Sequence, residues 1–506
     1  MAAELTAIIV GAGFSGLCAG IGLKRAGIHD FVILEKADQV GGTWRDNTYP
    51  GAACDIPSHL YSYSFEPNPQ WQRAYSGQPE ILAYLEHCAT KYGLREHLQL
   101  GTRVVKTEYD EATSCWTVET DDGRARVARS LILGNGALHL PKLPDIAGLD
   151  SFTGTTFHSA RWNHDYDVTG KRVAVIGTGA STIQFVPEIA PRTDHLAVFQ
   201  RTPPWIIPKP DRPIGERERW MFEHVPGAHW LRRTGLYWMF ESRVLGFAFA
   251  PKLNQLAEKL VLKHLAKSVP DRELRAKLTP DYRLGCKRVL ISNDYYATLQ
   301  RPNVDLVTAG IERIEQTGVR TTDGQLHAVD AIVFGTGFKV VDYVSAMQIV
   351  GKQGRDLNAV WHESVRNYLG ITVSGFPNLF LLMGPNTGLG HNSMIFMIEA
   401  QARYAVAAIR TMQRDRLAAL EVKPAVEAAF AGELSRKLKN TVWTSGCNSW
   451  YQAPDGEVLL WPGFTFDYWR RTRRVELADY DVVALAHSED GRKPRADLTL
   501  GEAHAI

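Results

Sequence analysis

Cysteine is scarce in this chain of 506 residues, and its six cysteines form no Cys-x-x-Cys pair and no zinc-like spacing. This absence argues against a dithiol redox centre, a structural zinc site and an iron–sulfur cluster. We therefore expect no bound metal, and we expect reduced thiols in a cytoplasmic protein. The cysteines are Cys18, Cys54, Cys88, Cys115, Cys286 and Cys447.

Long uncharged apolar runs are also absent, so no integral membrane segment is predicted. The nearest candidate, residues 236–250, is interrupted by Glu241 and Arg243. We interpret its aromatic side chains as the core of a helical subdomain; a membrane anchor is the alternative. These side chains are Trp230, Tyr237, Trp238, Phe240, Phe247 and Phe249.

Neither sign of charge dominates, since 57 Lys and Arg face 55 Asp and Glu, for a formal net charge of +2. No basic block predicts nucleic-acid binding, and no acidic tail predicts a disordered arm. The length predicts about three domains. The partners we expect are small molecules, and the sequence gives no indication of the oligomeric state.

What the chain does contain is two glycine-rich turns, each between an apolar strand and the start of a helix. Backbone N–H groups and the positive end of the helix dipole can hold a pyrophosphate there. The second turn ends in Thr182, where glycine or alanine usually permits close helix–strand packing. The first turn comprises Gly11, Ala12, Gly13, Phe14, Ser15 and Gly16, and the second Gly177, Thr178, Gly179, Ala180, Ser181 and Thr182.

In each unit, the residue after the second strand is charged, and the sign of that charge differs between the two units. Glu35 follows the second strand of the first unit, and Arg201 follows that of the second unit. A carboxylate accepts hydrogen bonds from a free ribose 2′-hydroxyl, whereas arginine pairs with a 2′-phosphate. The sequence therefore predicts FAD in the first unit and NADPH in the second.

These patterns predict an α/β fold with two Rossmann-like dinucleotide-binding domains and a helical insertion. A last buried strand near residue 380 and a long helix over residues 391–413 are expected in the first domain. We place the FAD-binding domain at residues 1–140 and 330–506, the NADPH-binding domain at 141–205 and 285–329, and the insertion at 206–284.

A chain with FAD and NADPH sites can belong to three main classes of enzyme, which differ in what receives the electrons. A disulfide reductase would need two neighbouring redox cysteines, and an electron-transfer reductase would need iron–sulfur ligands or a partner; the chain provides neither cysteine arrangement. An oxygenase needs a fixed cation near the flavin and a site closed to water.

Three segments resemble the type I Baeyer–Villiger monooxygenases. Residues 41–55 (GGTWRDNTYPGAACD) match the long signature of this family, and residues 152–163 match its shorter fingerprint except at Asn163, where the family has Pro or Asp. Residues 285–288 (GCKR) resemble its Lys-Arg segment. The resemblance extends over about residues 5–470 and is closer to the aryl- and aliphatic-ketone members.

The resemblance implies that Arg288 is the catalytic arginine beside the flavin and that Asp55 orients it. His158 and Trp162 would position the domains, and His391 and Asn392 receive no role. The expected FAD contacts, beside the first turn and Glu35, are Gly42, Thr43, Trp44, Asp55, Tyr61, Val104 and Met394. The expected NADPH contacts are Thr178, Gly179, Ala180, Ser181, Thr182, Gln184, Arg201, Thr202, Lys287, Arg288 and Trp450.

The implied activity is NADPH- and O2-dependent conversion of a ketone to an ester or lactone through a C4a-peroxyflavin. A flavin monooxygenase that oxygenates sulfur or nitrogen is one alternative. An NADPH oxidase or reductase that releases hydrogen peroxide is another. The identity of the ketone is not predicted.

Overall fold

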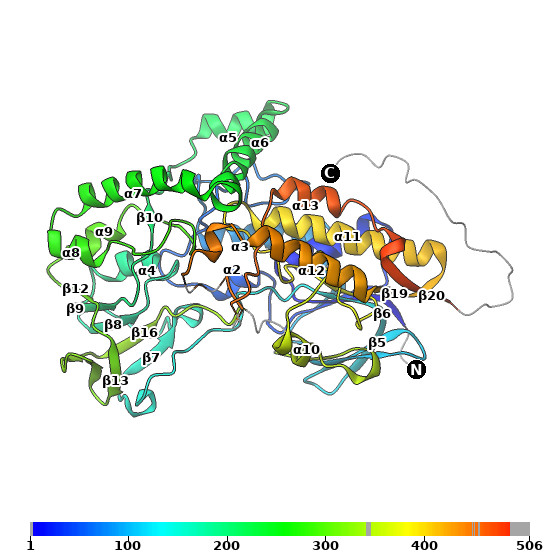
Figure 1. The fold of residues 1–506 in the computed structure, drawn as a ribbon, viewed down its shortest axis with the longest axis horizontal. Helices are drawn as coiled ribbons and strands as arrows, with labels where there is room; N and C mark the ends of the chain where they lie inside the picture. The colour runs from blue at the N-terminus through cyan, green and yellow to red at the C-terminus, as the bar shows by residue number, and fades with distance from the viewer. Residues whose placement is uncertain (1–3, 341–345, 448, 450, 454–455, 486–506) are drawn as a thin grey trace.

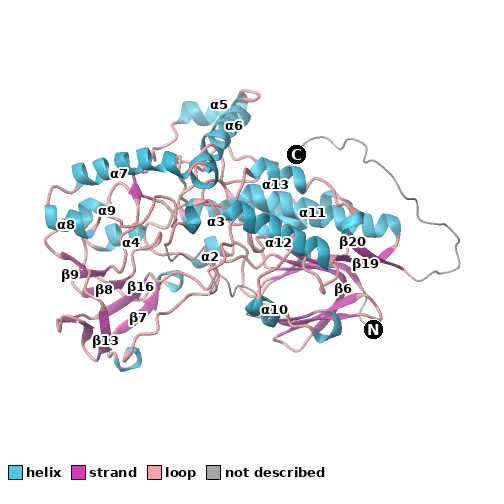
Figure 2. Cartoon of the chain, viewed as in Figure 1, coloured by secondary structure: helices cyan, strands magenta, loops and turns pink. Residues whose placement is uncertain are grey.

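The computed structural model describes residues 4–340, 346–447, 449, 451–453 and 456–485. Its two largest sheets lie at opposite ends of the molecule (Figure 1). In the same view, most of the helices lie above the sheets (Figure 2). The α/β class expected from the sequence is confirmed.

The first sheet is mixed and contains the first glycine turn. Its strand order is β17-β4-β5-β6-β1-β2-β3, and β18 also pairs with β6. The strands β1, β2, β6 and β18 are parallel, whereas β4, β5 and β6 run antiparallel. The bounds are β1 (Leu5–Val10), β2 (Phe31–Leu34), β3 (Leu98–Gln99), β4 (Val104–Asp110), β5 (Cys115–Thr120), β6 (Ala125–Leu133), β17 (Gln348–Val350) and β18 (Leu379–Leu381).

Both faces of this sheet are buried, and the helices α1 (Phe14–Arg25) and α11 (Met394–Asp415) cover one of them, which explains why its central strands are apolar throughout. The two helices pack against each other and share one core with Ile9, Ile33 and Phe380. The expected long helix begins at Met394 because the Ser393 hydroxyl accepts a hydrogen bond from the N–H of Ile395. Its N-terminus thus lies three residues later than predicted.

The second sheet is wholly parallel and contains the second glycine turn. Its order is β12-β9-β8-β16-β7. The strand β16 pairs with β8 and β7, so it belongs to this sheet, and the boundary expected at residue 330 falls one strand too early. The bounds are β7 (Thr155–His158), β8 (Arg172–Ile176), β9 (His195–Phe199), β12 (Val304–Val307) and β16 (Ala331–Phe334), with the helices α4 (Thr182–Ile189) and α9 (Tyr295–Thr298).

In the helical segment between the strands of the second sheet, α5 and α6 project from the top of the molecule in Figure 1, and α7 and α8 lie toward its left end. The short parallel pair β10 (Ile206–Ile207) and β11 (Leu290–Ile291) brings its two ends together. No helix among the described residues is both long and apolar enough to span a bilayer. The helical elements are α5 (Glu216–His224), α6 (Ala228–Glu241), the π-helical turn η4 (Leu245–Phe249), α7 (Asn254–Ser268) and α8 (Arg272–Lys277).

The interpretation of its aromatic side chains as a core is only half right. Phe240 and Phe247 are buried, but Trp230, Trp238 and Phe249 are 67%, 53% and 56% exposed. The helix α6 turns one face toward the first unit and the other toward solvent, which a run of aromatic letters does not reveal.

The remaining elements surround these parts. A three-stranded antiparallel sheet follows β12, and β19 pairs with β20 at the other end. The bounds are β13 (Ile311–Glu315), β14 (Gly318–Thr321), β15 (Leu326–Ala328), β19 (Leu417–Val422), β20 (Tyr480–Ala484), α2 (Thr43–Asp46), α3 (Gln78–Lys91), α10 (Leu357–Glu363), α12 (Pro424–Leu438) and α13 (Thr465–Arg471).

Each glycine turn is packed against a second glycine segment. A Cβ on Gly16 would lie 1.8 Å from the carbonyl oxygen of Gly11, so the first turn requires glycine there. In the second turn the equivalent residue is Thr182, and the space it needs is left by Gly335, at the end of β16. A Cβ on Gly335 would lie 2.0 Å from Thr182 Oγ1. The unusual Thr182 is therefore accommodated by the absence of a side chain opposite it.

This complementarity predicts the outcome of a pair of substitutions. Gly335→Ala should destabilise the fold by about 1–3 kcal/mol, because the added methyl group overpacks a filled site. Adding Thr182→Ala should recover most of the loss, since the conflicting atom is the hydroxyl oxygen. Thermal unfolding followed by circular dichroism measures both. Equal melting temperatures for the single and double variants would contradict this packing.

Candidate active site

The first glycine turn presents a helix N-terminus without a side-chain cap. Gly13 precedes α1, and the first turn of α1 contains no acidic residue. Among the described residues, a Cβ on Gly13 would meet only the backbone of Gly42 within 4 Å, with the nearest atom at 3.6 Å. Free N–H groups beside two glycines fit a pyrophosphate.

Glu35 lies at the position where the sequence predicts a residue that binds the ribose of the dinucleotide. It is 4% exposed, and its Oε2 accepts a hydrogen bond from the N–H of Ala12, at 2.8 Å. Its Oε1 is 3.0 Å from Nη1 of Arg45. The carboxylate is thus fixed at the edge of the glycine turn. The remaining lone pairs are the acceptors that a ribose needs.

Aromatic residues of the expected FAD contacts lie together beside this turn. The rings of Phe14 and Tyr61 meet edge to face at 5.3 Å, and Trp44 Nε1 donates to the Tyr61 hydroxyl at 3.2 Å. Met394 packs against the same core, whereas Val104 packs against the other face of the sheet. Thr43 is exposed at the start of α2.

Two cations lie close together in the second unit, one in the segment after β9 and one in the segment before β11. Arg201 is exposed and Lys287 is half-buried. Burial lowers the pKa of Lys287, and the charge of Arg201 lowers it further. Neither cation forms a salt bridge with the residues that the structure describes, although Lys287 lies 4.7 Å above the ring of Tyr282. Two adjacent cations that repel each other fit a phosphate.

The backbone of the second turn completes this arrangement. Thr178 Oγ1 donates to the carbonyl oxygen of Thr202 at 3.4 Å, which joins the turn to the segment after β9. Gly179 and Ala180 are exposed, so the turn is accessible to a ligand. Ser181 precedes α4 and makes no capping bond.

The long signature joins the two dinucleotide units. The hydroxyl of Tyr49 donates to Gln184 Oε1 on α4 at 2.9 Å, and Gln184 Nε2 donates to the carbonyl oxygen of Ala53 at 3.0 Å. Gly51 has φ of +76°, and a Cβ there would lie 2.8 Å from the carbonyl oxygen of Gln184. The Tyr-Pro-Gly motif therefore provides a close approach between units, and Gln184 contacts protein at this boundary.

Arg288 and Asp55 form an ion pair across the same boundary. Arg288 Nε and Nη2 donate to Asp55 Oδ2 at 3.0 and 2.8 Å, and Nη1 donates to the carbonyl oxygen of Leu389 at 3.2 Å. The two side chains are 21% and 29% exposed. Burial alone would lower the pKa of Arg288, but Asp55 raises it above its usual value. The guanidinium is therefore a permanent, fixed positive charge.

A buried carboxylate for which the sequence predicted no role contacts the segment that follows Leu389. Glu241 on α6 is 1% exposed and accepts from Asn392 Nδ2 at 2.6 Å and from the N–H and hydroxyl of Thr465 at 2.5 and 2.8 Å. His391 Nε2 is 3.6 Å away. Burial raises the pKa of Glu241, but these partners outweigh it and lower the pKa overall.

His391 and Asn392, for which the sequence predicted no role, belong to this cluster around Glu241. They follow Leu389, whose carbonyl contacts Arg288, and they connect that segment to α6. The sequence could have drawn attention to Glu241 only as a charge that interrupts an apolar run.

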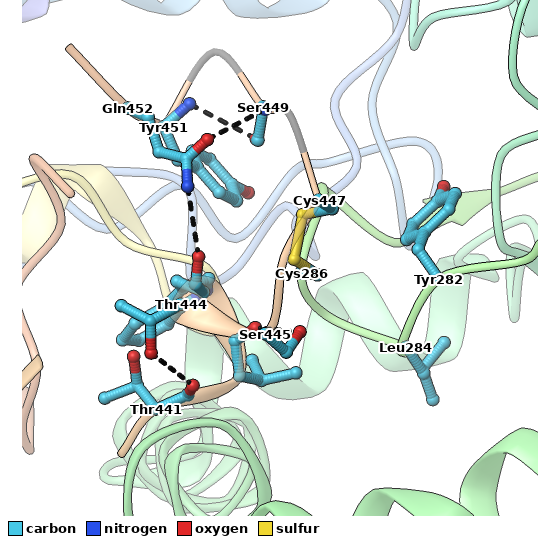
Figure 3. Close-up of a disulfide and its surroundings, with 12 residues drawn as sticks. Tyr282, Leu284, Cys286, Thr441, Thr444, Ser445, Cys447, Ser449, Tyr451 and Gln452 are labelled. Carbon is cyan, nitrogen blue, oxygen red and sulfur yellow. Dashed lines mark hydrogen bonds between the residues drawn. A yellow bond between two sulfur atoms is a disulfide. The ribbon is translucent and has the colours of Figure 1, made fainter. Parts of the chain in front are cut away.

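The cysteines require a correction, because Cys286 and Cys447 form a disulfide across 161 residues (Figure 3). Sequence spacing cannot show that two distant cysteines meet, and here the fold brings their Cα atoms to 6.2 Å. Cys286 directly precedes Lys287 and Arg288, so the bond joins the arginine segment to the segment that leads to Tyr451. The other four cysteines are free and buried.

The shorter fingerprint lies at the base of the second unit. His158 ends β7, and its Nδ1 accepts from the N–H of Ala160 at 3.1 Å. Trp162 packs edge-on against Phe157 at 5.1 Å and against Phe185 of α4 at 5.2 Å. Both residues contact protein within the second unit, and their role in positioning the domains stays a prediction. Trp450 lies outside the described residues.

Comparison with known proteins shows which folds and families this chain resembles. The family model described as pyridine nucleotide-disulphide oxidoreductase matches residues 8–214. Among solved structures, an oxidized steroid monooxygenase bound to NADP has a TM-score of 0.86 at 32% identity, covering 95% of this chain and 100% of that one. A cyclohexanone monooxygenase from Rhodococcus sp. Phi1 bound to NADP+ has a TM-score of 0.86 at 30% identity, covering 96% and 100%. The fold and the site thus define a flavin-dependent oxidoreductase.

Curated relatives define the family more closely. A Baeyer–Villiger monooxygenase of Pseudomonas aeruginosa is 49% identical over 94% of this chain and 91% of its own length. Another Baeyer–Villiger monooxygenase, from Streptomyces coelicolor, is 46% identical over 96% of this chain and 94% of its own length. This chain belongs to the Baeyer–Villiger monooxygenases.

Proposed function

We propose that this protein is an NADPH- and O2-dependent flavin monooxygenase that inserts one oxygen atom beside the carbonyl of a ketone to give an ester or lactone. The observation that supports this most directly is the Arg288–Asp55 ion pair where two dinucleotide-binding units meet. Membership in the Baeyer–Villiger monooxygenases agrees with it.

The chain's residues fit FAD in the first unit. The uncapped N-terminus of α1 would hold the pyrophosphate, and the fixed carboxylate of Glu35 would accept the ribose hydroxyls. FAD bound there supplies electron transfer from NADPH and activation of dioxygen. Gly42, Trp44 and Tyr61 would shape its pocket.

The second unit fits NADPH. Arg201 and Lys287 would bind the 2′-phosphate together with Thr202, because their mutual repulsion is relieved by an anion. The uncapped start of α4 and the exposed Gly179 and Ala180 would receive the pyrophosphate.

Arg288 would act on the negative charge that develops during oxygen transfer. Its guanidinium cannot lose its proton at any working pH. Asp55 and the Leu389 carbonyl occupy three of its N–H directions and fix its plane. A preoriented charge stabilises a developing anion without the cost of reorganisation.

The partners we propose are a small-molecule ketone and dioxygen. The closer relation to aryl- and aliphatic-ketone members stays a prediction, as does the absence of nucleic-acid partners. A cytoplasmic location also stays a prediction, and the Cys286–Cys447 bond does not favour it, since disulfides are rare in that compartment.

Products separate the proposal from its alternatives. Purified protein supplied with NADPH, air and either a ketone or a thioether should give ester from the ketone, with NADPH consumption matching product. Gas chromatography with mass spectrometry identifies the products. Sulfoxide without ester across a ketone panel would favour a sulfur- or nitrogen-oxygenating enzyme. Hydrogen peroxide alone would favour an oxidase.

Arg201→Ala should erode the preference for NADPH over NADH. The loss of a charge-assisted contact to phosphate costs about 1.5–3 kcal/mol, or roughly ten- to a hundredfold in kcat/KM. NADH lacks this phosphate and should be affected little. Arg192→Ala, which removes an exposed arginine elsewhere on the same unit, is the control. Equal losses with both nucleotides would mean that Arg201 is structural.

Arg288→Ala should uncouple NADPH consumption from product formation. The cofactor contacts of both turns are retained, so NADPH oxidation should continue, but ester formation should fall by about 10²–10³ or more and hydrogen peroxide should accumulate. Arg288→Lys should be nearly as poor, because a point charge cannot replace the planar fork. Assays of NADPH, peroxide and ester in one reaction test this.

The matched control is Arg283→Ala, five residues earlier, where the guanidinium pairs with Glu258 at the surface. It should keep near wild-type coupling. Ester formation at wild-type rate in Arg288→Ala would show that another residue provides the catalytic cation.

A further inference from the structure

The helical segment carries most of the exposed apolar surface of the described chain. Of the 20 large hydrophobic side chains that are exposed among the described residues, 13 lie between residues 220 and 262. Monomeric soluble proteins rarely gather exposed apolar side chains in one region without a binding role. The 13 are Trp220, Met221, Val225, Trp230, Leu231, Trp238, Met239, Leu245, Phe249, Leu253, Leu256, Leu260 and Leu262.

The pattern follows two helices that have a buried face and an apolar outer face. On α6, Leu236 and Phe240 are buried, whereas Leu231 and Trp238, seven residues apart, are exposed. On the other side of η4, Leu253, which directly precedes α7, and Leu256 and Leu260 on α7 recur at spacings of three and four residues, so they form one stripe. These exposed side chains are not needed to form the core, because the inner face of each helix is already packed.

Positive charge accompanies this surface. Residues 215–268 contain nine Lys and Arg but five Glu, a formal charge of +4, whereas the whole chain carries +2. Lys259 and Lys263 are exposed beside the leucine stripe of α7, and Arg232 is exposed beside Leu231 on α6. The helices α5 and α6 project beyond the rest of the molecule, and α7 forms the upper edge of its left half in Figure 1. This segment can therefore reach a flat surface first.

We propose that the outer faces of α6 and α7, with η4 between them, bind the surface of an anionic lipid bilayer. Tryptophan and leucine side chains enter the boundary between headgroups and acyl chains, while lysine and arginine pair with lipid phosphates. A second copy of this chain is a poorer occupant, because a two-fold contact would place this positive surface against itself. The attachment is peripheral and needs no spanning helix.

Vesicle sedimentation tests this with the full-length flavoprotein. Vesicles of phosphatidylcholine with about one third phosphatidylglycerol should bind the protein, and phosphatidylcholine alone should bind it less. The triple variant Trp230→Ser, Leu231→Ser, Trp238→Ser should lose binding by about tenfold or more. Its NADPH oxidation rate in solution shows that it is folded.

The controls separate apolar insertion from charge. Val482→Ser with Val483→Ser removes exposed apolar side chains from β20, at the other end of the chain, and should leave binding intact. Lys259→Glu and Lys263→Glu should weaken binding to anionic vesicles by about fivefold each, and hardly change binding to neutral ones.

Two results would overturn the proposal. One is equal vesicle binding by the wild type and the triple variant, or no binding by either. The other is a dimer in sedimentation equilibrium that the triple variant converts to a monomer while vesicles remain unbound, which would assign the surface to a second copy.

Discussion

The ion pair between Arg288 and Asp55 is the interaction on which the arrangement of the site depends. Arg288 belongs to the segment that follows the helical insertion, and Asp55 is the last residue of the long signature in the first unit. Two charges taken from water are costly unless geometry and further hydrogen bonds compensate them. Here both guanidinium contacts converge on one carboxylate oxygen, and the Leu389 carbonyl accepts a third N–H.

Other contacts hold the two units in the position that this pair requires. Gln184 binds Tyr49 and Ala53 through its side-chain amide, and Gly51 lets the backbones meet. Glu241 ties α6 to Asn392 and Thr465, close to the segment that supports Arg288. Cys286 and Cys447 join the arginine segment to the segment before Tyr451. The cation is thus supported from both units and from the insertion.

Local patterns predicted much of this structure because they are local consequences of strand and helix geometry. The two glycine turns, Glu35 after β2 and Arg201 after β9 follow from spacing within one βαβ unit. Arg288 and Asp55, 233 residues apart, were paired only through resemblance to a family. The disulfide and the Glu241 cluster were missed because no spacing rule joins residues that only the tertiary fold brings together. The same holds for Thr182, whose hydroxyl fits because Gly335, directly after β16, leaves space for it.

A double-mutant cycle on Arg288 and Asp55 tests the central claim most directly, with ester formed per NADPH consumed as the measured quantity. If Asp55 acts by holding Arg288, then Asp55→Asn should lower the coupling in the wild type but add little to Arg288→Ala, giving strong non-additivity. Independent losses that multiply in the double variant would contradict an account in which one fixed, inter-unit ion pair controls oxygen transfer.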